Sequence, residues 1–171
     1  MIIYKDQKLL LLRCRSFSKY SFVEEHNAIS DIKGKVWLLK TGKSISSPKM
    51  KDIMEESHCL ILKESKADGG KYYWADVYSV YEGAPNKEMD YPSYYGEMLL
   101  KYDGDLSQLN GTWLQIGTIH RFPEGYEKAL KLVSNKKSAA ETLKQTRSST
   151  LYVFTSERLD LDDEGWGESV G

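Results

Sequence analysis

The stretch KYYWADVYSVYEG, residues 71–83, decides the fold. Its tyrosines, tryptophan and valines are residue types enriched in β-strands. The pair Gly69-Gly70 stands directly before it and marks a tight turn. We therefore expect residues 71–83 to form the longest strand of the protein.

Shorter elements are expected on both sides of this strand. Apolar runs bounded by turn residues predict strands at 8–15, 36–40, 58–64, 112–122 and 149–154. Helices are expected at 21–33, 48–54, 124–132 and 139–144, the first capped by Ser18 or Ser21 and ended by Gly34. Because strands and helices do not alternate regularly, we expect an α+β fold. Its sheet would be mixed or antiparallel and curved, closing toward a small barrel flanked by short helices.

The length of 171 residues fits a single domain, residues 1–171, with a core large enough to be stable. No apolar run approaches the roughly 20 residues of a membrane span, and the first residues lack a signal-peptide pattern. We therefore expect a cytoplasmic protein with no membrane partner. Residues 84–111 are rich in turn residues and too long for an ordinary connection, which indicates a functional loop. Residues 160–171 are expected to form a mobile acidic tail.

The two cysteines, Cys14 and Cys59, each adjoin an apolar run and are expected to be buried reduced thiols. His26, His58 and His120 are scattered and show no metal-ligand spacing. We expect no metal and no cofactor.

The net charge of −1 argues against indiscriminate binding to a phosphate backbone. Lysines nevertheless crowd residues 35–51 and 128–144, while acidic residues gather at 157–168. The small net charge is therefore compatible with a basic face on one side of the protein.

Four segments resemble EVE domains, members of the PUA-like superfamily. VWLLKTGKSIS (36–46) is similar to the opening strand and polar loop of that family, which usually read Y-W-L-x-K-S-E-P. KYYWADVYSVYEGAPNKEMDY (71–91), TWLQIGTIHRFP (112–123) and AAETLKQTRSSTLYVF (139–154) resemble its central strand, next strand and closing signature. The order and spacing agree from about residue 34 to residue 160. The chain departs from the family at Thr41-Gly42-Lys43 and at Ser149-Thr150.

The resemblance implies a single PUA-like domain in which residues 1–33 form a strand–helix extension outside the family core. It also implies a pocket for one flipped-out base, often a modified one, in DNA or RNA. Such a pocket needs aromatic walls and a few fixed polar groups. Tryptophans and tyrosines would form the walls, and two polar loops would contact the base edge and the phosphates. The candidate ligand-binding residues are Trp37, Lys40, Thr41, Lys43, Ser44, Trp74, Tyr94, Tyr95, Trp113, Arg147, Ser148 and Ser149.

Two other functions stay open. The first is a protein–protein interaction module that uses the tyrosine-rich loop, with the acidic tail as the main argument. The second is a small amidohydrolase or nuclease like the ASCH relatives of the superfamily, which use a lysine, a threonine and a glutamate. Lys40 and Thr41 would serve there, with Glu82 or Glu97 as the carboxylate. We expect a binding module rather than an enzyme.

Overall fold

The computed structural model describes residues 1–17, 19–40, 47–65, 70–97, 111–146 and 148–164. The strands are β1 (Ile2–Ile3), β2 (Lys8–Cys14), β3 (Val36–Lys40), β4 (Cys59–Glu64), β5 (Tyr72–Gly83), β6 (Gly111–Ile116), β7 (His120–Arg121), β8 (Leu130–Leu132), β9 (Thr150–Thr155) and β10 (Leu159–Asp160). The helices are α1 (Phe22–Lys33), α2 (Ser47–Ser57) and α4 (Ala139–Gln145), with 3-10 turns η2 (Tyr126–Ala129) and η3 (Leu161–Glu164).

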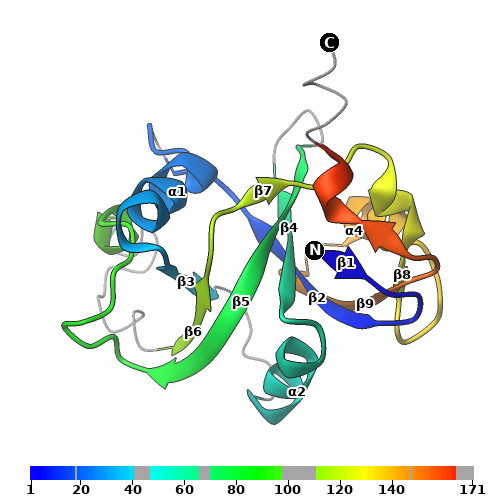
Figure 1. Cartoon of the computed structure of the whole chain (residues 1–171), viewed down its shortest axis with the longest axis horizontal. Helices are drawn as coiled ribbons and strands as arrows, with labels where there is room; N and C mark the ends of the chain where they lie inside the picture. The colour runs from blue at the N-terminus through cyan, green and yellow to red at the C-terminus, as the bar shows by residue number, and fades with distance from the viewer. Residues whose placement is uncertain (18, 41–46, 66–69, 98–110, 147, 165–171) are drawn as a thin grey trace.

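The main sheet has the strand order β3-β6-β5-β4-β2-β9-β8, with β7 paired to β5 (Figure 1). Strands β2 and β4 run parallel, and the other neighbours in this sheet are antiparallel. The fold is therefore α+β with a mostly antiparallel sheet. Strands β3 and β8 lie at its two edges, so the sheet is open.

Strand β5 joins the two halves of this sheet. It is 12 residues long, and it pairs with β4 through its first half and with β6 through its second half. The register shifts between Val77 and Ser79, which is a β-bulge. Bulges bend a strand and increase its twist, which accounts for the curvature in Figure 1. The sequence prediction of the longest strand is confirmed.

Alternation along the strands divides the interior into three clusters. Leu10 and Leu12 of β2 share an inner core with Leu38 of β3 and Leu114 of β6, closed by α1 and α2. Leu9 of β2 points to the opposite face, which α4, η2, β1 and β10 cover. A third cluster, mostly aromatic, packs on the outer face of β3 and β6.

The predicted boundaries of α1 are confirmed. The Ser21 hydroxyl accepts a hydrogen bond from the Glu24 N–H at 3.3 Å, as an N-cap does. Gly34 has φ +84 and its N–H donates to the Ser30 carbonyl at 2.7 Å. This left-handed conformation favours glycine and ends the helix.

Two expectations near the C-terminal half need correction. Residues 124–132, expected as one helix, form η2 followed by β8, because Leu130 and Leu132 are buried through pairing with β9. Residues 160–164, expected at the start of a tail, form the end of β10 and η3, and Leu161 is buried. Strand β10 pairs with β1. Residues 165–171 lie outside the described part.

Residues 1–33, expected as an extension, contribute to the main sheet itself. Strand β2 lies between β4 and β9, and its leucines enter both faces. Both cysteines are free and buried, as expected. Burial raises the pKa of Cys14 to about 12, so its thiol stays protonated.

Candidate functional site

An aromatic cluster covers the outer face of β3 and β6. It consists of Phe17, Tyr20, Trp37, Tyr81, Tyr91, Tyr94, Tyr95 and Trp113, together with Leu39 and Met89. Trp113 is 0% exposed and contacts Tyr91 and Tyr95 at centroid distances of 4.9 and 6.0 Å. Rings from residues far apart in the chain are thus packed against one another in one cluster.

The edge of β3 positions this cluster. The Trp37 N–H donates to the Asp90 carbonyl at 2.8 Å, and the Leu39 N–H donates to the Tyr95 hydroxyl at 3.4 Å. An unpaired edge strand presents a row of such donors. Residues 90–95 satisfy two of them, and this fixes the irregular segment against the sheet.

A buried histidine completes the attachment. His26 Nδ1 lies 2.7 Å from the Phe22 carbonyl, and its Nε2 is hydrogen-bonded to the Tyr95 hydroxyl. Burial lowers the pKa of His26 to about 4, so the ring is neutral at pH 7. Because a carbonyl only accepts, Nδ1 carries the proton and Nε2 accepts from Tyr95. The Tyr95 hydroxyl therefore donates to His26 and accepts from the Leu39 N–H.

Four predicted wall residues are brought together here, and one is not. Trp37, Tyr94, Tyr95 and Trp113 share the aromatic cluster. Tyr94, Tyr95 and Trp113 are buried against their neighbours, whereas Trp37 is half-buried and contacts Tyr81 edge-on. Trp74 lies in the cluster on the α4 side, with its ring 4.7 Å from that of His120. It shares no wall with the other four.

Lys40 ends β3 on the opposite face from Trp37 and Leu39. It is buried, and burial lowers the pKa of its amine. Register places Lys40 opposite Thr112, which is opposite Glu82. The Thr112 hydroxyl donates to the Glu82 carboxylate at 2.9 Å. A lysine, a threonine and a glutamate therefore stand on three adjacent strands. The neighbouring candidates Thr41, Lys43 and Ser44 lie outside the described residues.

The second predicted polar loop lies at the start of β9. Ser148 is exposed and Ser149 is half-buried, while Arg147 lies outside the described residues. Arg13 anchors this loop because its guanidinium donates to the Ser148 carbonyl at 2.8 Å and to the Leu143 carbonyl at 2.5 Å. The loop follows α4, whose buried residues belong to a different cluster from the aromatic one.

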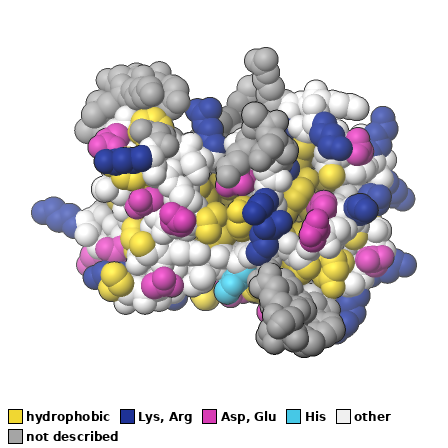
Figure 2. All heavy atoms as spheres, turned by 90° about the horizontal axis from the view of Figure 1, so that it is seen from above, with side chains coloured by type: hydrophobic (Ala, Val, Ile, Leu, Met, Phe, Trp, Pro, Cys, Tyr) yellow, Lys and Arg dark blue, Asp and Glu magenta, His cyan; other side chains and the backbone are white. Residues whose placement is uncertain are grey.

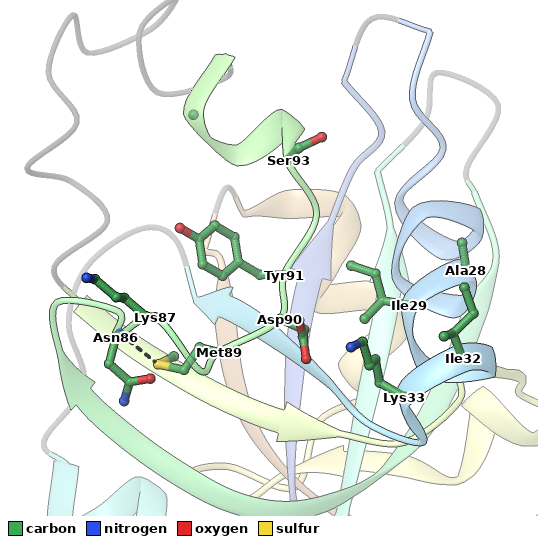
Figure 3. Close-up of a pocket in the computed structure, with 11 residues that line it drawn as sticks. Ala28, Ile29, Ile32, Lys33, Asn86, Lys87, Met89, Asp90, Tyr91 and Ser93 are labelled. Carbon is green, nitrogen blue, oxygen red and sulfur yellow. Dashed lines mark hydrogen bonds between the residues drawn. The ribbon is translucent and has the colours of Figure 1, made fainter.

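A hollow of about 720 Å³ opens beside the aromatic cluster, between α1 and residues 86–96 (Figure 3). Its described lining consists of Ala28, Ile29, Ile32, Lys33, Asn86, Lys87, Met89, Asp90, Tyr91, Ser93 and Gly96. This volume lies within the range of about 300–1,000 Å³ that is usual for ligand pockets. None of the eight predicted residues that the structure describes lines it. Trp37 nevertheless contacts the lining, because its N–H donates to the carbonyl of the lining residue Asp90.

The lining combines an aromatic wall with polar groups. Tyr91 is half-buried, and its ring stacks on Tyr95 with centroids 5.9 Å apart and planes 13° apart. Figure 3 shows Ile29, Ile32 and Lys33 projecting from α1 toward the segment that carries Asp90 and Tyr91. Ile32 is 83% exposed at the rim of the hollow.

Sequence reasoning missed this lining, although two signals were present. Ile32 interrupts a polar stretch near the end of α1, and Asn86-Lys87 with Asp90-Tyr91 follows the longest strand directly. Neither segment carries a motif that would mark it as a binding site in the sequence alone. Only the attachment of residues 90–95 to the edge of β3 brings them together.

Charges of both signs lie on the face of the molecule that Figure 2 shows. Figure 2 shows hydrophobic side chains in a band across the upper face, with basic and acidic side chains interspersed on either side. A mixed surface favours a small number of local phosphate contacts over a broad basic track. Among the residues that the structure describes, no group of His, Cys, Asp and Glu could hold a metal ion.

Comparisons with protein-family models, with curated proteins and with solved structures found no match to this chain. In the described ranges, no helix is both long enough and apolar enough to cross a bilayer.

Proposed function

We propose that this protein is a cytoplasmic, PUA-like module that binds DNA or RNA by seating one flipped-out base, a modified one, in the hollow between α1 and residues 86–96. The open, curved sheet would correspond to the PUA-like barrel that the sequence resemblance implies. The observation that carries the proposal is the hollow itself, with the Tyr91 ring held on one wall by Tyr95.

The lining suits a heterocycle. A base offers two apolar faces and a hydrogen-bonding edge. Tyr91, Met89 and Ile29 supply apolar surface for the faces. Asn86 and Asp90 supply a donor and an acceptor for the edge, because the Asn86 Oδ1 already accepts from the Glu88 N–H at 2.9 Å and leaves its amide NH₂ as donor.

The cations of the hollow suit phosphates. Lys33 and Lys87 line it, and within the described residues neither ammonium forms an ion pair. Such cations position a nucleic acid through its backbone without reading its sequence. A cation at each side of the hollow accounts for affinity, and the edge contacts account for selectivity.

Titration with labelled single-stranded oligonucleotides tests the proposal. We expect tighter binding of strands that carry a modified cytosine or adenine than of the unmodified strands. Tyr91→Ala should weaken binding by tenfold or more, because stacking on an aromatic ring contributes about 1–3 kcal/mol per base. Tyr91→Phe should retain most of the affinity. The matched control is Tyr4→Ala, an exposed tyrosine next to β1. Identical isotherms for modified and unmodified strands, or no binding at low salt, would remove the proposal.

The Lys40–Thr112–Glu82 arrangement favours a second candidate, an amidohydrolase. The lowered pKa of Lys40 increases the fraction of neutral amine, which a general base requires. Glu82 orients the Thr112 hydroxyl. Thr112 would take the place of Thr41 in this candidate. Hydrolysis of acylated cytidine that disappears in both Lys40→Ala and Thr112→Val would raise this function above base reading.

A further inference from the structure

An exposed tyrosine stands outside the hollow, on the bulge of β5. Tyr78 lies between Val77 and Ser79, where the register against β6 shifts. Its side chain is 51% exposed, although tyrosine usually covers apolar surface. Bulges re-aim side chains and are frequent next to functional sites. The bulge therefore holds one large ring outward.

Two neighbours hold this ring in place. The Lys35 ammonium lies over it, 4.5 Å from the centroid, in a cation–π contact. Gly117 lies beside it, and a Cβ built on that glycine would stand 3.1 Å from the Tyr78 hydroxyl. A glycine here lets the ring lie close to the end of β6. The ring is presented to solvent in a fixed pose.

A second, smaller hollow opens against the same ring. It measures about 240 Å³ and lies between α2 and β5. Its lining consists of Lys51, Met54, Glu55, His58, Val77, Tyr78, Ser79 and Val80. His58 directly precedes β4 with φ +53, so the chain turns sharply there. The hollow thus combines an aromatic wall with a cation, a carboxylate, an imidazole and a hydroxyl.

Residues close together in the chain contact both hollows. Lys33 lines the larger one and Lys35 covers Tyr78 at the smaller one, with only Gly34 between them. Two residues span at most about 7 Å of chain. A strand that leaves the larger hollow past the end of α1 would meet Lys35, which lies over the Tyr78 ring.

We infer that Tyr78 and the hollow beside it form a second subsite, which binds the nucleotide adjacent to the recognised base in the same strand. This inference rests on the proposed function. The flanking base stacks on the Tyr78 ring, and Lys35 contacts the intervening phosphate. Stacking of this kind tolerates any base, because every base has a π face. The subsite adds affinity without sequence preference.

The test compares two probes on the same variants. The probes are single-stranded trinucleotides with 5-methylcytosine or N6-methyladenine at the centre, and the corresponding mononucleotides. Tyr78→Ala should weaken trinucleotide binding roughly tenfold and leave mononucleotide binding unchanged. Tyr78→Phe should keep the wild-type affinity for both. Tyr4→Ala again serves as the control, and thermal melting confirms that each variant folds.

The outcomes separate the two proposals. Suppose that Tyr78→Ala binds the trinucleotides as tightly as the wild type does, while Tyr91→Ala loses this binding. This result overturns the second subsite and leaves the base reader intact. Equal losses for both probes in Tyr78→Ala also overturn it, because the ring would then act on the first hollow. No binding of either probe by the wild type overturns the proposed function and the subsite with it.

Discussion

The Tyr95 hydroxyl is hydrogen-bonded to Nε2 of His26, from a position 69 residues further along the chain. The same oxygen accepts the Leu39 N–H. This one oxygen therefore joins helix α1, the edge of β3 and the segment that lines the larger hollow. The shape of the proposed base site depends on it.

Removal of the Tyr95 hydroxyl should destabilise the protein, whereas removal of the Tyr94 hydroxyl should not. Tyr95→Phe leaves the Leu39 N–H and the His26 Nε2 buried without a partner, which costs about 1–3 kcal/mol. Tyr94→Phe is the matched control, because the Tyr94 hydroxyl is buried and has no hydrogen-bond partner in the described structure. Urea denaturation measures both. Equal losses in the two variants would contradict the assigned network.

Acid should weaken the fold through His26. Its pKa is about 4 in the folded protein, below the value of about 6.5 for an unfolded chain, so the unfolded state binds the proton more readily between these values. The free energy of unfolding should therefore fall as the pH drops from about 6.5 toward 4, by up to roughly 3 kcal/mol. His26→Gln should remove most of this slope, and His120→Gln should not. An unchanged slope in His26→Gln would show that other groups govern the acid response.

Gly70 should be less replaceable than Gly125. Both have positive φ, which costs an L-residue about 1–2 kcal/mol. A Cβ on Gly70 would also meet the Glu64 carbonyl oxygen at 2.0 Å, whereas a Cβ on Gly125 meets nothing within 4 Å. Thermal melting should show a clearly larger loss for Gly70→Ala than for Gly125→Ala. A larger loss for Gly125→Ala would mean that the turn before β5 adapts.

The salt dependence of binding should identify the phosphate contacts. Lys87→Ala and Lys33→Ala should each reduce the slope of log K against log salt by about 0.7, the value for one contact to a single strand. Lys136→Ala, in the turn between β8 and α4, is the control and should leave the slope unchanged. If the Lys136 variant alone changed the slope, the nucleic acid would bind at the other end of the molecule.

Local patterns predicted most of the fold. Ser21 and Gly34 delimit α1 because capping depends only on adjacent residues. The aromatic and β-branched run at 72–83 forms β5 for a similarly local reason. The helix expected at 124–132 is wrong because Leu130 and Leu132 alternate as in a strand, but three residues are too few to show a period, and only the pairing with β9 decides.

The candidate site could be predicted only in part. Four rings that the sequence singled out do meet, but they fill the space between them and leave the hollow to other residues. Trp74 points away from the inner core, as Trp37 and Trp113 do, but it packs in the separate cluster on the α4 side. It faces the same side as Ile61, whereas Ala75 faces the inner core. Which face each half of a bent sheet exposes is set by the bulge in β5, and the sequence carries no visible mark of that bulge.

The most direct test follows single nuclei of the hollow by NMR during addition of the modified-base trinucleotides. The account predicts saturable shifts of the Asn86 side-chain amide and the Met89 methyl group, with the Trp74 indole N–H unchanged because it lies in the other outer cluster. Shifts at Trp74 without shifts at Asn86 and Met89 would contradict a base site between α1 and residues 86–96.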